Sequence, residues 1–296
     1  AANGSAPAAG AEAGPKTPWL LVCAMSLLLA AIAWGFTREG APDPTGLLCG
    51  LAGVGVGQIA VLIYYAARRT FFGGSLIQSK DHVVSSLAAD VRGHLAEPEG
   101  FLMLTCYLAG TWLLRIMPES YYDVESRINW LHVLVQLLLT DFLMFVMHYT
   151  QHQIRSLYRV GHKPHHRWLS PKLTDAFNGS VTDTLIMILI PLVVTARTLH
   201  VCCWSYIAFG ALYSMSLCLI HAEWRHPWDG VFALLGIGTA ADHHVHHRNV
   251  VHNFGHLFTY WDRLFGKYKS PDRLFKVGPG DASKHQGSYG KVKVHK

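Results

Sequence analysis

The sequence predicts an all-α integral membrane protein with four to six transmembrane helices and a cytosolic helical cap that carries a histidine-rich dimetal site. The 296 residues are 51% hydrophobic and only 15% charged. The apolar residues gather in runs of nearly twenty, the length that crosses a bilayer as a helix. Clusters of histidine follow several of these runs. The runs therefore predict membrane helices, and the clusters predict a metal site at the helix ends.

The apolar runs set the order of the elements. We expect transmembrane segments over residues 19–36, 46–66, 101–117, 129–147, 184–199 and 203–220. The fifth segment contains Pro191, so we expect it to kink or to span only in part. The run at 19–36 has the alternative of a signal peptide, although its length and the next run favour a retained helix. The polar stretch at 67–99 has some amphipathic character and is typical of an interfacial helix.

These segments divide the chain into four parts. A disordered N-terminus is expected over residues 1–18, and N-terminal transmembrane helices with the interfacial segment over 19–128. Residues 129–275 hold the histidine clusters, and residues 276–296 form a basic tail. The cysteines lie in apolar segments without a CxxC pair, so no disulfide framework is expected.

The charge distribution predicts the orientation in the membrane. The net charge is +6, and lysine and arginine gather after the second, fourth and sixth apolar runs. The opposite side would hold only Arg38, Arg115, Arg127 and Arg197. The positive-inside rule then places both termini and every histidine cluster in the cytosol. The sequons at Asn3 and Asn178 are therefore expected to stay bare, and nothing further supports nucleic-acid binding.

Nine histidines follow a spacing that suits metal binding. They are His148 and His152 in an HxxxH motif, His162, His165 and His166 in an HxxHH motif, His221 at the end of an apolar run, and His243, His246 and His247 in a second HxxHH motif. Residues at i, i+3 and i+4 share one face of a helix, so each cluster can direct its imidazoles at one point. Imidazole binds iron, zinc and copper. Nine imidazoles are too many for one ion and suit two.

Other residues near the clusters have alternative roles. Asp141 lies seven residues before His148 on the same helix face, where an intramembrane carboxylate is costly. We expect it to orient a ligand histidine by a hydrogen bond, with a polar contact between helices as the alternative. His244 lies off the shared face, and His252 and His256 either line the site or lie at the surface.

Several classes of protein do not fit this pattern. The sequence contains no HExxH motif of a zinc protease and no G-x-S-x-G motif. Only Glu223 and His226 have the ExxH spacing of soluble diiron enzymes. A metal transporter should place its ligands near the middle of the bilayer, whereas these clusters lie at helix ends. The pattern therefore favours a membrane enzyme.

Residues 138–273 resemble the fatty acid hydroxylase / sterol desaturase superfamily of membrane non-haem diiron oxygenases. Thr140 and Asp141, followed by His148 and His152, match the first box of this family. The motif HKPHHRW at 162–168 is similar to that of sterol C5-desaturases, whereas HAEWRHPW at 221–228 and HHVHH at 243–247 are closer to C4-methylsterol oxidases. FTYWDRLFGKYKSP at 258–271 resembles a shared C-terminal signature. Two departures are Tyr149, where relatives often have arginine, and Ser180-Val181, where they often have His-Pro.

The resemblance implies a membrane-bound diiron oxygenase that uses O2 and two external electrons to hydroxylate or desaturate a sterol or sterol-like lipid. Residues 129–275 would be the fatty acid hydroxylase-type catalytic domain, with two iron ions that zinc can replace on purification. The chain has no HPGG haem motif, so cytochrome b5 or its NAD(P)H reductase would supply electrons. The implied location is the endoplasmic reticulum membrane.

The sequence leaves two alternative functions open and predicts where the lipid binds. The alternatives are a fatty acyl or sphingolipid hydroxylase, and a catalytically inactive sterol-binding relative. We expect the lipid pocket between the helix bundle and the cytosolic cap. The aromatic residues expected to line it, or else to form an interfacial belt, are Trp168, Phe177, Trp224 and Trp228.

Overall fold

The computed structural model describes residues 42–74, 76–78, 82 and 84–273 of the chain. Within these ranges the chain is mostly helical, and its β pairing consists of the isolated bridges Leu76–Trp224 and Ile237–Phe258. The all-α prediction is confirmed for this part of the protein. The first expected segment, the N-terminus at 1–18 and the tail at 276–296 lie outside the described residues.

Three helical stretches are long and apolar enough to cross a membrane, namely Pro44–Phe72, Trp130–Gln153 and Val181–Thr198. They coincide with three of the expected segments. The helix Cys203–Leu219 is apolar but shorter, and the segment expected at 101–117 contains the helix Met103–Leu113. The apolar helices indicate membrane association, and the number of spans stays a prediction.

The α-helices of the described chain are α2 (Pro44–Ala67), α3 (Leu87–Ala96), α4 (Met103–Leu113), α5 (Trp130–Gln153), α6 (Arg155–Leu157), α7 (Val181–Thr184), α8 (Ile190–Thr198), α9 (Cys203–Leu219), α10 (Asp229–Leu234), α11 (Ala240–Asn249) and α12 (Tyr260–Leu264). Short π or 3-10 turns lie at Arg68–Phe72, Pro98–Leu102, Glu119–Tyr122, Tyr158–His162, His165–Arg167, Leu173–Asp175, Leu185–Leu189 and Pro271–Arg273.

Local signals in the sequence explain where the long helices begin. The Asp43 side chain accepts a hydrogen bond from the Gly46 amide at 3.0 Å, and Pro44 occupies the first position of α2. Asn129 caps α5 in the same way. Pro191 lies in the first turn of α8, directly after the π turn Leu185–Leu189. Because a wide turn there accommodates the missing amide hydrogen, the helical stretch continues across this proline.

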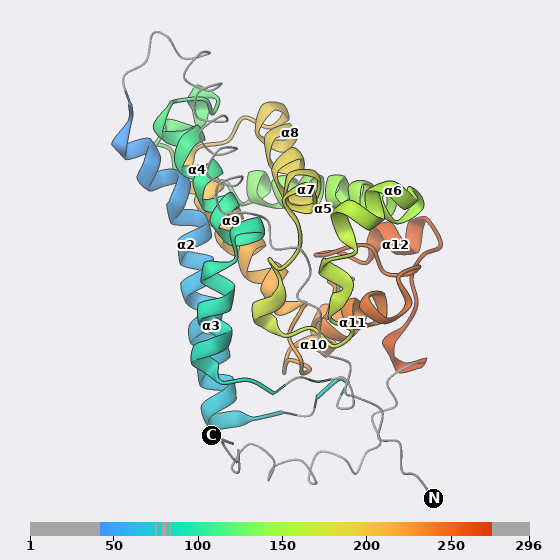
Figure 1. Cartoon of the computed structure of the whole chain (residues 1–296). Coiled ribbons are helices and arrows are strands. Elements are labelled where there is room, and N and C mark those ends of the chain that lie inside the picture. Colours follow the sequence, from blue (N-terminus) through green and yellow to red (C-terminus); the bar gives the residue numbers. More distant parts are fainter. Residues whose placement is uncertain (1–41, 75, 79–81, 83, 274–296) are drawn as a thin grey trace, which may run out of the picture.

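Helix α2 lies along the left edge of the molecule in Figure 1, and it packs closely against α9. Helix α2 packs against α9 and α4, and α5 packs against α9 and α8. Gly53 faces Gly210 of α9, and a Cβ atom on Gly57 would lie 2.4 Å from the carbonyl oxygen of Ala211. Small residues let helix backbones approach closely where lipid gives no hydrophobic driving force. The glycines of α2 therefore set the spacing of these two helices.

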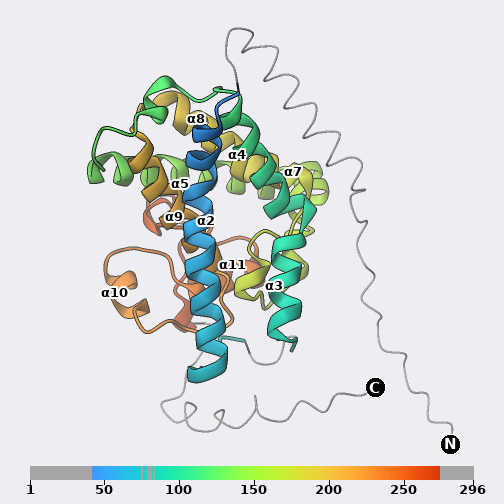
Figure 2. The ribbon, with the colours of Figure 1, turned by 90° about the vertical axis from the view of Figure 1, so that its left-hand side faces the viewer.

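The cap, which includes α10 and α11, lies at one end of the helix bundle. Both views place α10 and α11 in the lower half of the molecule, away from α4, α7 and α8 (Figures 1 and 2). Helix α3, within the stretch expected to lie at the membrane interface, turns polar residues inward. His94 of α3 is buried between the Gln58 side chain, at 2.8 Å, and the carbonyl oxygen of Thr174, at 2.9 Å. This helix therefore connects α2 to the cap.

Candidate metal centre

Helix α11 places three histidines in the interior of the cap. Thr239 and Asp242 form a reciprocal capping box that starts the helix. His243, His246 and His247 follow on one face, and each is at most 2% exposed. Helix α11 therefore buries several polar side chains. Their ring nitrogens are stable in the interior of the protein only when they have partners.

The nine histidines expected from the sequence form two groups in the structure. A five-histidine group contains His148, His152, His162, His166 and His246, and a four-histidine group contains His165, His221, His243 and His247. Within each group, one ring nitrogen from each residue lies within 4.8 Å of the others. Both HxxHH motifs contribute to both groups, so the division does not follow the motifs.

The nitrogen atoms that face each other within the groups fit bound cations. The Nε2 atoms of His221 and His243 are 2.9 Å apart, and those of His166 and His246 are 3.1 Å apart. Among the described residues, the buried Nε2 atoms of His148, His152 and His162 have no hydrogen-bond partner. Buried nitrogens without partners are costly, and a metal ion in each group would bind their lone pairs. The donor set therefore fits two ions that accept imidazole.

The opposite nitrogens of six of these histidines are held by oxygen acceptors. The Nδ1 contacts are His148 to Phe254 O (2.7 Å), His162 to Asp183 Oδ1 (2.9 Å), His165 to Asn178 O (2.8 Å), His221 to Leu217 O (2.6 Å), His246 to His252 O (2.8 Å) and His247 to Trp168 O (3.0 Å). An acceptor at Nδ1 keeps the proton there and leaves the Nε2 lone pair available to a metal.

Burial keeps the imidazoles neutral. It lowers the pKa of His165 to about 4 and holds the pKa values of His166, His243 and His246 well below their usual range. Neighbouring histidines add to this effect because their positive charges would repel each other. Neutral imidazole is the form that binds metal.

Asp183 is a residue of the site that the sequence analysis missed. Its buried carboxylate accepts from His162 Nδ1 at 2.9 Å and from Gln151 Nε2 at 3.2 Å. Ser180, in the position where relatives often have histidine, caps α7 by accepting from the Asp183 amide at 3.1 Å. It also donates to the Gly161 carbonyl oxygen at 2.7 Å. The available signal was a second carboxylate at the start of an apolar run.

Asp141 has different partners from the ligand histidine that we expected. Its carboxylate accepts from the amides of Leu257, at 2.7 Å, and Phe258, at 3.0 Å, and from Trp261 Nε1 at 3.0 Å. Seven residues along α5 separate it from His148 by about 10 Å, so the carboxylate reaches the loop after α11 instead. The expected direct bond to a ligand histidine is therefore corrected: Asp141 anchors that loop.

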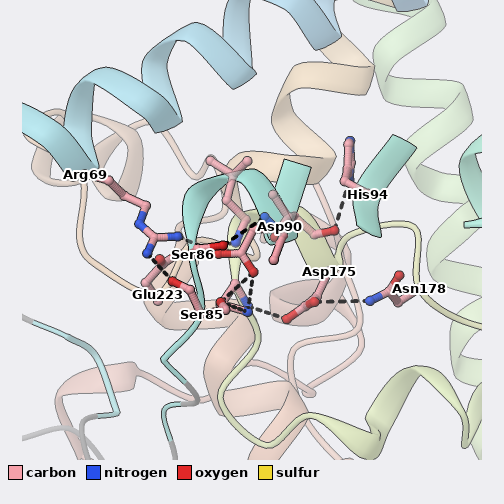
Figure 3. Close-up of polar contacts among 12 residues, drawn as sticks. Arg69, Ser85, Ser86, Asp90, His94, Asp175, Asn178 and Glu223 are labelled. Carbon is pink, nitrogen blue, oxygen red and sulfur yellow. Dashed lines mark hydrogen bonds and ion pairs between the residues drawn. The ribbon is translucent and has the colours of Figure 1, made fainter. Parts of the chain in front are cut away.

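A charged network holds the loop that supports His165. Asn178, whose carbonyl accepts from His165, donates its amide to Asp175 Oδ1 at 3.1 Å (Figure 3). The other Asp175 oxygen accepts from the Lys172 amide at 2.9 Å, and Lys172 Nζ lies 2.6 Å from Asp90 Oδ1. The network therefore joins the loop 172–178 to α3.

Glu223 adds a second connection to the same region. Its carboxyl group accepts from Tyr65 at 3.3 Å and from the Leu173 amide at 3.4 Å. Burial raises the pKa of Glu223 to about 7. Arg69 pairs with Asp90 at 2.5 Å in the same network (Figure 3). These contacts join α2 and α3 to the loops that carry Leu173 and Glu223.

The remaining histidines of the cap lie outside the two groups. His244 contacts the Ala222 carbonyl oxygen at 3.0 Å and Gln78 at 2.8 Å. His226 contacts the Tyr64 hydroxyl at 2.7 Å and the Leu219 carbonyl oxygen at 3.0 Å. His256 also joins neither group, but it is buried beside them.

An apolar cavity opens against both histidine groups. His162, His165, His221 and His256 line one part of it. Its apolar walls are Met144, Phe177, Met187, Ile188 and Leu217, from membrane helices and the loop before α7. An apolar lining beside the imidazoles is typical of a site where a hydrocarbon group binds near a reactive centre.

The four aromatic residues expected at the pocket have different positions. Phe177 lines this cavity, whereas Trp228 lines a separate one. Trp224 is buried and stacks on Tyr65, with ring centroids 5.6 Å apart. The Trp168 carbonyl oxygen accepts from His247. Only Phe177 among these four belongs to the cavity beside the histidines.

Comparisons with known proteins identify the family of the chain. The model of the fatty acid hydroxylase family matches residues 133–267. The chain is 44% identical over 236 residues to alternative squalene epoxidase of Phaeodactylum tricornutum, which covers 78% of this chain and 68% of the relative. It is 27% identical to methylsterol monooxygenase 1 of Danio rerio over 53% of this chain and 55% of the relative. It is 31% identical to lathosterol oxidase of Rattus norvegicus over 56% of each chain.

These relatives define the class of the protein. The chain belongs to the fatty acid hydroxylase / sterol desaturase superfamily, and it is an oxidoreductase. It spans about two thirds of the length of the squalene epoxidase relative and about half of the other two. No solved structure matches the chain.

Proposed function

We propose that this protein is a membrane-bound diiron oxygenase that transfers one oxygen atom from O2 to a sterol or a sterol precursor. The observation that carries the proposal is the pair of buried histidine groups at one apolar cavity. The reaction takes the lipid, O2, two electrons and two protons to the oxygenated lipid and water. Two irons, when bound, would supply the activation of O2.

The chain's own residues bind the lipid and keep the imidazoles in the form that binds metal. Met144, Phe177 and Leu217 exclude water from the cavity and orient the hydrocarbon. The oxygen acceptors at Nδ1 hold six imidazoles in the form that binds metal. Asp183 holds His162, the one imidazole of these six with a carboxylate partner.

The names of the relatives suggest which lipid to test first. The relative at 44% identity is named a squalene epoxidase, so epoxidation of a double bond in squalene is our first candidate. Epoxidation adds one oxygen atom and removes no hydrogen. Sterol hydroxylation or desaturation is the second candidate, which the methylsterol monooxygenase and lathosterol oxidase relatives favour.

Metal content tests the site directly. We expect the His165→Ala and His246→Ala proteins, one from each group, to lose bound iron when it is measured by elemental mass spectrometry on purified protein. His132 is exposed at the start of α5, so His132→Ala should keep the iron of the parent. Zinc in place of iron would still support the site. Unchanged metal in His246→Ala would contradict the assignment.

Lipid analysis tests the reaction. A host that contains squalene and sterols would express either the parent chain or a variant carrying both His246→Ala and His247→Ala. Squalene that gains one oxygen atom only with the parent chain would support epoxidation. A sterol that gains oxygen or loses two hydrogens would support the second candidate instead. A changed fatty acid or sphingolipid would reject both candidates in favour of a fatty acyl or sphingolipid hydroxylase. Iron-loaded protein that forms no product would indicate a catalytically inactive relative.

We further propose that electrons come from cytochrome b5 and an NAD(P)H-dependent reductase, and that the cap faces the cytosol at the endoplasmic reticulum. The basic residues near the histidines, such as Arg155, Arg159 and Lys163, support this orientation. Purified protein should oxidise its lipid with cytochrome b5, reductase and NADH. If activity needs a different reductant, the proposed electron donor is wrong, and the proposed oxygenation reaction is unaffected.

A further inference from the structure

His256 lies between the two histidine groups without belonging to either. Its ring centroid is 4.9 Å from that of His148 in the five-histidine group and 5.5 Å from that of His243 in the four-histidine group. It also lines the cavity together with His162 and His221. His256 is therefore positioned where both groups and the apolar cavity meet.

The chain around His256 is anchored on both sides. The Leu257 amide donates to Asp141 at 2.7 Å, and the Gly255 amide donates to Asp262 at 2.7 Å. Both carboxylates are buried. Because backbone bonds to buried carboxylates hold the loop, the backbone of His256 has a defined position beside the two groups.

The ring of His256 has a hydrogen-bonding capacity that its surroundings do not use. The residue is 6% exposed, and its Nδ1 atom is buried with no hydrogen-bond partner in the described part of the chain. The neighbouring imidazoles are the proposed metal ligands, and His256 lies outside both sets of converging nitrogens. A buried imidazole nitrogen that is neither a ligand nor bonded is costly unless a further group occupies the space beside it.

We propose that His256 is a catalytic residue whose Nδ1–H would donate a hydrogen bond to O2 when metal ions in the two histidine groups bind it. This inference rests on the proposed function, since it requires metal in both groups. It assigns to His256 the task of orienting the oxygen toward the lipid in the cavity. Hydrogen bonds aimed at developing charge in a dry site are effective because they need no reorganisation.

The test uses nitric oxide, a diatomic molecule that binds ferrous iron and accepts hydrogen bonds. The iron-loaded, reduced holoprotein would be titrated with nitric oxide, and the N–O stretching frequency would be recorded by infrared spectroscopy. We expect His256→Ala to keep its iron but to bind nitric oxide about fivefold more weakly, with a shifted frequency. His256→Asn places an amide N–H near the position of Nδ1 and should restore most of both values.

The matched control is His200→Asn, because His200 is exposed between α8 and α9. It should change neither readout. The proposal is overturned if His256→Ala loses iron, because His256 would then be a ligand. It is also overturned if affinity and frequency equal those of the parent. The assay needs only a chemical reductant, without lipid or a protein electron donor, so a failure to find the lipid product would reject the proposed function while the role of His256 is judged separately.

Discussion

At the scale of single residues, the site depends on which nitrogen of each imidazole carries the proton. Six ring Nδ1 atoms face oxygen acceptors, and five of those acceptors are backbone carbonyls. The sixth, Asp183, is a side chain that can be changed without altering the backbone. The role of these contacts in metal binding can therefore be tested at Asp183.

Replacing Asp183 by Asn should weaken metal binding without removing a ligand. The amide is uncharged, and it can present N–H to His162 Nδ1, which would favour the wrong tautomer. Such partners typically contribute 10- to 100-fold in metal affinity, so we expect a loss of about that size. Competition with a chelator would measure it.

Asp123→Asn is the control for this measurement. The Asp123 carboxylate bonds Glu125 and Ser126 of its own turn, away from the histidines. Its variant should bind metal like the parent. Equal affinities for Asp183→Asn and Asp123→Asn would show that the contact to His162 has no effect on metal binding.

At the scale of elements, the bundle depends on the close contact of α2 with α9. A Cβ on Gly57 would lie 2.3 Å from Ser214 Oγ and 2.4 Å from Ala211 O, whereas nothing lies within 4 Å of a Cβ on Gly55. The two glycines are half a turn apart on the same helix. The close contact with α9 therefore requires glycine at position 57 and not at position 55.

Gly57→Leu should destabilise the protein, whereas Gly55→Leu should not. The new side chain at Gly57 would separate the helices, and such overpacking costs about 1–3 kcal/mol. At Gly55 the helix propensity of leucine is better than that of glycine. Thermal unfolding in the same detergent would compare the two variants. Equal melting temperatures would show that α2 and α9 do not pack as described.

At the scale of the whole molecule, buried histidines outside the metal groups should make stability depend on pH. Burial lowers the pKa of His226 to about 4 and that of His244 to about 4. An unfolded chain has histidine pKa values near 6.5. Between these values the unfolded state binds protons that the folded state does not. Stability should therefore fall as the pH drops from about 6.5 toward 4.

Melting temperatures across this pH range would measure the effect. In His226→Gln one of the buried imidazoles is absent, so the decrease in melting temperature on acidification should be smaller than in the parent. The difference between the two melting temperatures should stop changing with pH above about pH 7, where histidine is neutral in both states. Parallel curves over the acidic range would contradict the account.

The orientation of the whole molecule has its own test. The Asn178 amide donates to Asp175 in the loop beside the histidine groups, and the proposed topology puts this loop in the cytosol. We therefore expect no glycan at Asn178, as judged by peptide mass spectrometry of protein from a eukaryotic host. A glycan there would place the cap in the lumen and reject the topology. Asn3, the other sequon, lies outside the described residues.

Much of the site could be predicted from the sequence because its spacing is local. The pairs at i, i+3 and i+4 select eight of the nine histidines, since a helix brings such residues to one face, and His221 follows from its place at the end of an apolar run. The division into two groups could not be predicted, because His165 and His166 are adjacent in the chain and belong to different groups. The partners of Asp141 were wrongly expected for a similar reason, since they lie more than 110 residues away.

The sequence by itself predicted the helical class of the described chain, three apolar helices long enough to cross a membrane and the histidines that converge in the two groups, because hydrophobic runs and helical periodicity are local properties. Only the tertiary structure decided which imidazoles face each other, that Asp183 holds His162, and that His256 lies between the two groups. These features depend on contacts between distant segments, and the chain order of such segments does not specify their distance in space.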